Sequence, residues 1–349
     1  MNTQVMALKD AFKRAFRIGA SLNTEQVLGR DARGAAIVRQ HYDSITPENL
    51  LKWSNVHSTP NGFEFSAADR YVDFGEENGM FIVGHTLVWH RDVPEWVFRA
   101  GNEPLGRDRV LAHMRHHIST VVGRYKGRIH GWDVVNEALN GDGTLRRSPW
   151  LNALGEDYVA HAFRFAHEAD PSAELYYNDF ALEPPKLDGA VALVRRLVAE
   201  GLPITAVGVQ HHDKLHSPTI PEVEATIEAF AGLGLKVMIT ELDVNVLPPV
   251  PNQAGTARKP DPSLNPYVVG LPDDVGQALA KRYAELFATF LRYRDVVSRV
   301  TFWNVTDGDS WLNDWPVLGR TSHPLLFDRV GQPKAAFFAV LEQARAALG

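Results

Sequence analysis

Short runs rich in Val, Ile, Phe and Tyr alternate along the chain with longer segments whose apolar residues recur at helical spacing. The runs predict strands at residues 15–20, 40–45, 80–89, 129–137, 173–178, 204–211, 236–242 and 300–306. The longer segments predict helices at residues 67–79, 108–126, 155–169, 186–201, 220–233, 275–295 and 334–348. Strands that alternate with helices indicate a parallel sheet covered by helices, which is an α/β fold.

The number of these strand–helix units favours a closed (β/α)8 TIM barrel, with the whole chain, residues 1–349, as a single catalytic domain. The runs at 81–83 and 237–239 are uninterrupted, as expected of strands covered on both faces. An open doubly wound sheet is the alternative, and it would need a glycine-rich phosphate turn after its first strand. Residues 19–22 read Gly-Ala-Ser-Leu and lack the later glycines of that turn, so we favour the barrel.

One stretch, from about residue 245 to 277, interrupts the alternation. It contains seven prolines and shows no clear periodicity. Loops of this length are usually functional or disordered. We therefore interpret it as a loop insertion that leaves the top of the barrel and returns to it.

Composition narrows the classes of function. The formal net charge is −6 and no cluster of Lys or Arg offers a basic groove, so we expect no nucleic-acid partner. Cysteine is absent, which excludes disulfides, thiolate metal sites and cysteine nucleophiles. No window approaches the roughly 18 apolar residues of a membrane helix, and the apolar stretch before Lys9 is too short for a signal-peptide core. The compartment stays open between the cytoplasm and secretion after removal of a leader.

Polar side chains gather where the predicted strands end, which in a TIM barrel is the face of the active site. Glu137 and Glu241 each follow an apolar run directly and would face each other across the barrel mouth. Two facing carboxylates suit glycosidic bond cleavage, in which one acts as an acid and the other as a nucleophile or as the base that activates water. For either residue alone, a structural ion pair or a helix cap is the alternative.

Aromatic residues lie at the same strand ends. Of the eight Trp residues, Trp53, Trp89, Trp303 and Trp311 fall near strand tops, beside Asn, Gln, His and Lys. Flat rings that pack on sugar faces, with polar groups for the hydroxyls, suit a sugar site, although Trp plugs over the barrel are the alternative.

Two interpretations from other classes stay open. His85, His90, His211 and His212 also lie near strand tops, which would suit a metal-dependent barrel hydrolase. Against it, no His-x-His pair ends the first strand and no His-Glu-x-x-His motif occurs. The other is a non-catalytic carbohydrate-binding barrel. We expect no metal, no cofactor and a monomeric chain.

Taken together, the motifs resemble those of glycoside hydrolase family 10, the endo-β-1,4-xylanases. In family order, from about residue 15 to the end, the matching pieces are SITPEN at 44–49, KW at 52–53, GHTLVWH at 84–90, WDVVNE at 132–137, YND at 177–179, QHH at 210–212, ITELD at 239–243, TFW at 301–303, Trp311 and PLLFD at 324–328. Any one motif is moderately specific, and all of them in this order are a strong signal.

The resemblance implies a retaining endo-β-1,4-xylanase that cleaves internal bonds of xylan through a covalent glycosyl-enzyme, with xylan and xylo-oligosaccharides as partners. It implies Glu137 as acid/base and Glu241 as nucleophile, with Asn136 bonded to the 2-hydroxyl of the cleaved sugar and His212 bridging Glu241 and Asp243. It places substrate-binding residues at subsite −1 (His85, Trp89, Gln210, Trp303), at −1 and −2 (Glu48, Asn49, Lys52, Trp311) and towards +1 (Tyr177, Asn178).

The resemblance also implies a non-proline cis peptide at His85-Thr86. Asp43, Leu50-Leu51 and Asn304 depart from common family residues, which leaves the fine specificity open. A preference for short xylo-oligosaccharides, as in an intracellular type of enzyme, or for another β-1,4-glycan is the alternative with the same chemistry. We expect the proline-rich stretch to wall the aglycone side of the cleft.

Overall fold

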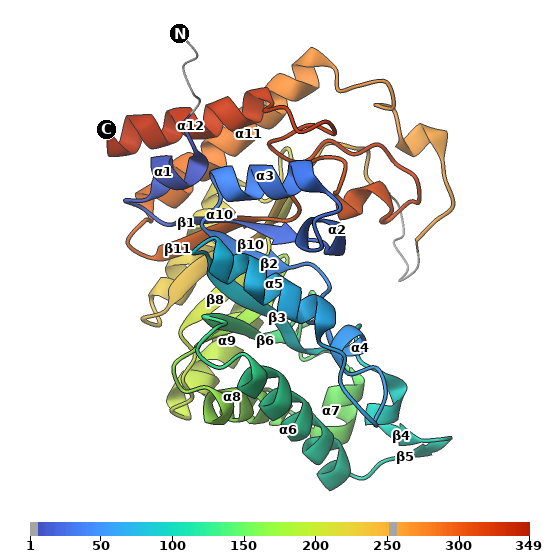
Figure 1. Cartoon of the computed structure of the whole chain (residues 1–349). Helices are drawn as coiled ribbons and strands as arrows, with labels where there is room; N and C mark the ends of the chain where they lie inside the picture. The colour runs from blue at the N-terminus through green and yellow to red at the C-terminus, as the bar shows by residue number, and fades with distance from the viewer. Residues whose placement is uncertain (1–5, 251–256) are drawn as a thin grey trace.

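The computed structural model describes residues 6–250 and 257–349, and within them eight parallel strands close into a barrel (Figure 1). In the order in which they pair around the ring, these strands are β1 (Arg17–Leu22), β2 (Ser44–Pro47), β3 (Phe81–Trp89), β6 (Gly131–Asn136), β7 (Glu174–Asp179), β8 (Ala206–Val209), β10 (Lys236–Asn245) and β11 (Val297–Phe302). The parallel pairing of β11 with both β10 and β1 closes the ring. The predicted TIM barrel is therefore confirmed.

Helices surround the barrel on its outer side (Figure 1). The longer ones are α3 (Ala32–His41), α5 (Ser66–Glu77), α6 (Arg107–Arg124), α8 (Tyr158–Ala169), α9 (Lys186–Ala199), α10 (Ile220–Ala231), α11 (Asp273–Arg292) and α12 (Ala335–Leu348). The short elements are α1 (Leu8–Phe12), α2 (Thr24–Val27), α4 (Trp53–Val56), α7 (Pro149–Leu154), η1 (Glu95–Val97), β4 (Arg99–Ala100), β5 (Glu103–Pro104), β9 (His212–Lys214), η2 (Pro262–Leu264) and η3 (Trp311–Asn313). Within the described residues, no helix combines the length and apolar character needed to cross a bilayer.

One of the longer helices, α3, was not predicted, and it shifts the start of the next strand. Helix α3 begins after Asp31, whose side chain accepts a hydrogen bond from the Gly34 amide at 2.9 Å. It runs through His41, so β2 begins at Ser44 and not at residue 40. The short apolar run 35–38 packs one face of this helix against the barrel. The strand predicted at 40–45 included the last residues of the helix, so the helix itself was missed.

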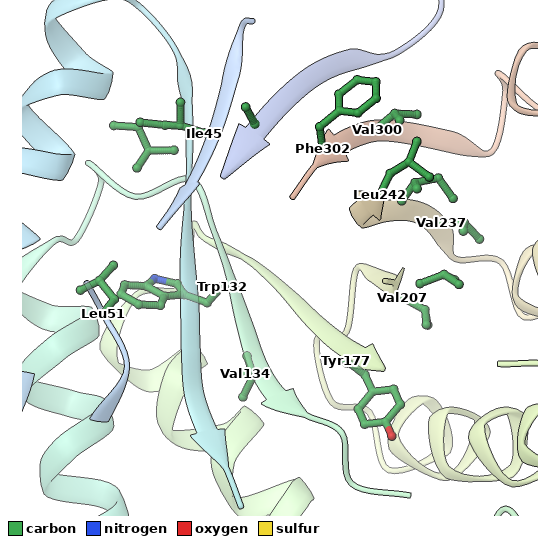
Figure 2. Close-up of a cluster of buried hydrophobic side chains, with 14 of the residues drawn as sticks. Ile45, Leu51, Trp132, Val134, Tyr177, Val207, Val237, Leu242, Val300 and Phe302 are labelled. Atoms are coloured by element: carbon green, nitrogen blue, oxygen red, sulfur yellow. The ribbon is translucent and has the colours of Figure 1, made fainter. Parts of the chain in front are cut away.

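Side-chain alternation along the strands separates two buried regions. The larger core lies between the strands and the helices, and Figure 2 shows part of it, with Trp132 and Tyr177 among the labelled side chains. A smaller cluster comprises Val83, Tyr176, Ala206 and Met238, contributed by β3, β7, β8 and β10. Because successive residues of a strand point to opposite faces, Tyr176 belongs to the smaller cluster inside the barrel and Tyr177 to the outer core.

The long segment after β10 packs on the loop that follows β11. The amide of Arg258 donates to the carbonyl of Pro316 at 2.9 Å, and the amide of Leu318 donates to the carbonyl of Arg258 at 2.9 Å. Asn265 accepts a hydrogen bond from the Thr321 amide at 2.8 Å. Residues 251–256 of the predicted insertion lie outside the described residues. The described part therefore extends from the barrel top, as expected, and returns at α11.

The contact between β3 and β6 makes a stability prediction. A Cβ on Gly84 would overlap the ring of Trp132, which is fully buried. We expect Gly84→Ala to lower the free energy of unfolding by about 1–3 kcal/mol, the usual cost of overpacking, measured by urea denaturation. Gly123→Ala is the matched control, because nothing lies within 4 Å of its Cβ and it is part of α6. The control should gain about 0.5–1 kcal/mol, and equal effects of the two changes would contradict the packing argument.

Candidate active site

A cavity of about 710 Å³ opens at the carboxyl ends of the barrel strands. The predicted site residues that line it are Glu48, Asn49, Lys52, His85, Trp89, Asn136, Glu137, Gln210, His212, Glu241, Trp303 and Trp311. They come from β2, β3, β6, β8, β10 and β11 or from the loops that follow these strands. Parallel strands that end on one face bring together polar residues that are far apart in the sequence.

Glu241 is held by two hydrogen-bond donors from neighbouring elements. His212 Nε2 lies 3.1 Å from Oε2 of Glu241, and Asn178 Nδ2 donates to Oε1 at 2.8 Å. The other ring nitrogen of His212 lies 2.9 Å from Oδ2 of Asp243, which also accepts from the indole of Trp311 at 2.7 Å. His212 therefore bridges Glu241 and Asp243, and the geometry fixes its ring.

The charges of this bridge decide the protonation state of Glu241. Burial favours the neutral form of His212, yet the Asp243 and Glu241 carboxylates raise its pKa to about 10. Its ring is therefore charged at neutral pH and donates from both nitrogens. Burial also works against an ionised Glu241, but the hydrogen bonds from His212 and Asn178, together with the electrostatic effect of the nearby histidines, outweigh it and lower the pKa of Glu241.

Glu137 has the opposite environment. Burial raises its pKa, and the negative charges of Asp179 and Glu241 raise it further. Gln210 Nε2 lies 3.2 Å from Oε1 of Glu137. The backbone of Glu137 is left-handed, with φ of 56°, and the Glu137 amide donates a hydrogen bond of 2.9 Å to the Asn178 carbonyl. Strained backbone of this kind persists only where the surroundings hold it, often at active sites.

An amide network connects the two glutamates. Oδ1 of Asn136 accepts from Asn178 at 2.9 Å and from Gln210 at 3.2 Å. Thr240 donates to Oδ1 of Asn178 at 2.7 Å, which orients that amide so that its nitrogen faces Glu241. The oxygen of Asn136 accepts twice, so its amide nitrogen, which lies 3.5 Å from Oε1 of Glu137, is the group that can donate to a ligand.

The aromatic and basic residues of the cavity surround these carboxylates. His85 Nδ1 lies 2.9 Å from Oδ2 of the buried Asp133, and the His85-Thr86 bond is cis, which confirms that expectation. Lys52 donates to Asn49 at 2.8 Å, and its ammonium lies 4.9 Å from the centre of the Trp89 ring.

The structure corrects the expected places of Tyr177 and Asn178, because neither lines the cavity. Both side chains are completely buried. Tyr177 belongs to the outer core and donates to Asp179 at 2.5 Å, since the alternation of β7 turns it away from the barrel interior. Asn178 points inward but lies behind Asn136 and Glu241, so it orients these side chains and does not reach a substrate. Asp243 is likewise buried and acts through His212.

Several cavity residues were missed by the sequence reasoning. Those that line the cavity beside the predicted set include Arg91, Arg146, Phe180, Glu183, Asp213, Lys214 and Trp315. Arg146 donates to the carbonyls of Glu137 and Leu139, at 3.3 and 2.9 Å, and so braces the loop after β6. Only their position in the sequence could have indicated them, because most of them follow the end of a predicted strand by a few residues.

The described parts of the proline-rich stretch, residues 245–250 and 257–277, do not line this cavity. Its contacts are with the loop after β11, as described above, so the expected wall on the aglycone side is not formed by these residues. Separately, residues 6–250 and 257–349 contain no group of three His, Asp or Glu side chains arranged to hold a metal ion.

Comparison with known proteins gives a consistent result. The sequence profile of glycosyl hydrolase family 10 matches residues 7–343. This chain belongs to glycosyl hydrolase family 10. The endo-1,4-beta-xylanase A of Xylanibacter ruminicola is 41% identical over 92% of this chain and 89% of its own length. The beta-1,4-xylanase of Dictyoglomus thermophilum is 40% identical over 97% and 91%.

The fold of this family member matches solved structures equally well. A family 10 endoxylanase retrieved from a sugarcane soil metagenome superimposes with a TM-score of 0.93 and 43% identity, over 96% of this chain and 99% of that one. The family membership makes this chain a glycoside hydrolase, and it confirms the resemblance on which the expected site rested.

The His212 bridge predicts a pH-dependent stability. The pKa of the His212 side chain is raised from 6.5 to about 10. The free energy that the charged side chain adds to folding is therefore complete below pH 6.5 and is lost as pH rises through about 10. We therefore expect His212→Asn to lower the melting temperature most near pH 6, with the deficit shrinking towards pH 10. His216→Asn is the control, because His216 is exposed. A deficit that does not change between these pH values would contradict the charged bridge.

Proposed function

We propose that this chain is a retaining endo-β-1,4-xylanase in which Glu137 is the acid/base and Glu241 the nucleophile. The observation that carries the proposal is the pair of carboxyl groups in one cavity whose pKa values move in opposite directions. Such a pair supplies a protonated acid and an ionised nucleophile at the same pH.

The first half of the reaction uses both groups at once. The ionised Glu241 attacks the anomeric carbon of the sugar in subsite −1, while Glu137 gives its proton to the glycosidic oxygen as that bond breaks. The products are a glycosyl ester on Glu241 and a shortened chain that leaves with the proton. Glu137, now ionised, then takes a proton from water, and the water oxygen displaces Glu241 from the anomeric carbon. Two inversions at this carbon retain its configuration.

The neighbouring residues have supporting roles in this proposal. The amide nitrogen of Asn136 donates to the 2-hydroxyl, a hydrogen bond that strengthens in the transition state. His212, held by Asp243, keeps Glu241 ionised and oriented. Asn178 is a positioning residue that contacts Glu241 and not the substrate.

Sugar-binding residues follow from the cavity lining. We assign His85, Trp89, Gln210 and Trp303 to subsite −1, and Glu48, Asn49, Lys52 and Trp311 to subsites −1 and −2. The substrates are xylan and xylo-oligosaccharides. All of these residues come from one chain, so residues 1–349 act as a single catalytic domain and a monomer suffices.

The proposal is tested by incubating the purified protein with soluble glucuronoxylan and a chelator and following the products by chromatography. We expect a ladder of oligosaccharides that shortens with time, because the two-carboxylate mechanism needs no metal ion. Activity that the chelator abolishes would favour a metal-dependent hydrolase. Binding of xylo-oligosaccharides without release of reducing ends would favour a carbohydrate-binding barrel.

The role of Glu137 predicts a dependence on the leaving group. Glu137→Ala should lower kcat/KM on xylan by about 10²–10⁴-fold, the usual contribution of general acid catalysis. The loss should be far smaller on an aryl xylobioside with a good leaving group, which needs little protonation. Glu183→Ala is the matched control, because it removes another cavity carboxyl group and should leave the ratio of the two activities unchanged. An equal loss on both substrates in Glu137→Ala would show that Glu137 is not the acid.

The double displacement predicts the stereochemistry of the product. Proton NMR of a fresh digest of xylohexaose should show the β-anomer at the new reducing end first, and the α-anomer only as mutarotation proceeds. An initial α-anomer would mean a single displacement and would remove Glu241 from the role of nucleophile.

A further inference from the structure

Two residues without an assigned role meet at the edge of the active-site cavity. Arg91 follows β3 and Trp315 follows β11, and both line the cavity. The guanidinium carbon of Arg91 lies 5.7 Å from the centre of the Trp315 ring, which is cation–π distance. Neither residue belongs to a motif that the sequence comparison singled out.

The order of the strands shows which sector of the barrel mouth lies between the two residues of this contact. In the barrel, β1 and β2 lie between β11 and β3. A contact between the loops of β3 and β11 therefore spans the sector of the barrel mouth that β2 supplies with Glu48, Asn49 and Lys52. This sector is the glycone side in the proposed function, on which the present inference rests.

The two partners differ in how firmly they are held. The amide of Trp315 donates to the Trp311 carbonyl at 3.1 Å, and Arg320 donates to the Trp315 carbonyl at 3.3 Å. The next residue, Pro316, accepts the hydrogen bond from Arg258, so the segment after β10 supports this loop. Arg91, by contrast, is exposed, and no carboxylate pairs with it in the part of the chain that the structure describes. Trp315 is the fixed partner and Arg91 is the movable one.

We propose that Arg91 and Trp315 form a strap that closes the glycone end of the cleft beyond subsite −2 and so limits product length. An indole face is a good platform for a sugar ring. With Arg91 over it, this face is covered, and a third xylosyl unit on the glycone side does not stack there. Cleavage then releases mainly disaccharide from the non-reducing end, while the aglycone side stays open to polymer.

The strap is tested with xylohexaose labelled at its reducing end, by measuring which bond is cleaved. In Arg91→Ala the uncovered Trp315 face should admit a third glycone sugar. The ratio of trisaccharide to disaccharide released from the non-reducing end should rise about two- to fivefold, the range of an exposed cation–π contact. Arg91→Gln, which keeps much of the side-chain length but not the charge, should shift the ratio in the same direction.

Two further variants separate the strap from a general change in the cleft. Trp315→Ala removes the platform together with the strap, so its trisaccharide ratio should stay below that of Arg91→Ala. Arg109→Ala removes an exposed arginine of α6 that does not line the cavity, and it should match the wild type. Wild-type cleavage with an unchanged ratio in Arg91→Ala would overturn the strap alone. Failure of the wild type to cleave xylohexaose would overturn the proposed function and the strap with it.

Discussion

The active site depends on keeping one buried carboxylate ionised. Burial alone would favour the neutral form of Glu241, and only a charged partner that is itself held in place reverses this. His212 is that partner, because Asp243 on the same strand as Glu241 holds its other nitrogen. The indole of Trp311 donates to the same Asp243 oxygen, so a residue at the cavity wall is tied to the same bridge. The protonation state, the orientation of the nucleophile and the shape of the sugar site are therefore set together.

The second carboxyl group gains its role from the first. An ionised Glu241 in the same cavity raises the pKa of Glu137, beyond what burial alone does, so the charge that makes one residue a nucleophile helps to keep the other an acid. The amide network of Asn136, Asn178 and Gln210 joins the two groups without supplying a charge. These neutral donors fix the positions of the two carboxyl groups, and the Asn178 hydrogen bond also helps to lower the pKa of Glu241. The same carboxyl group can then release a proton in one step and take one up in the next.

The alternation of side chains along each strand separates the packed interior of the barrel from its outer core. On β7, Tyr176 fills the interior, Tyr177 joins the outer core, and Asn178 returns to the interior one layer nearer the mouth. The layer of Tyr176 with Met238 closes the barrel below the polar groups, and Arg299 lies 5.3 Å from the Tyr176 ring there. The polar residues at the mouth therefore lie above a packed layer of the barrel interior. The Arg91–Trp315 strap lies further out, in the loops beyond the strand ends.

The sequence by itself determined the barrel, the positions of its strands to within a few residues, and the set of polar residues at the strand ends. Period and composition carry this information, because each strand must bury its faces and each functional group must follow a strand. Only the tertiary structure decided that Tyr177 is buried away from the cavity and that Asn178 acts behind Glu241, since one residue of phase reverses the face of a strand. It alone also brought Arg91 to Trp315, because that contact joins loops separated by two other strands and by more than two hundred residues of chain.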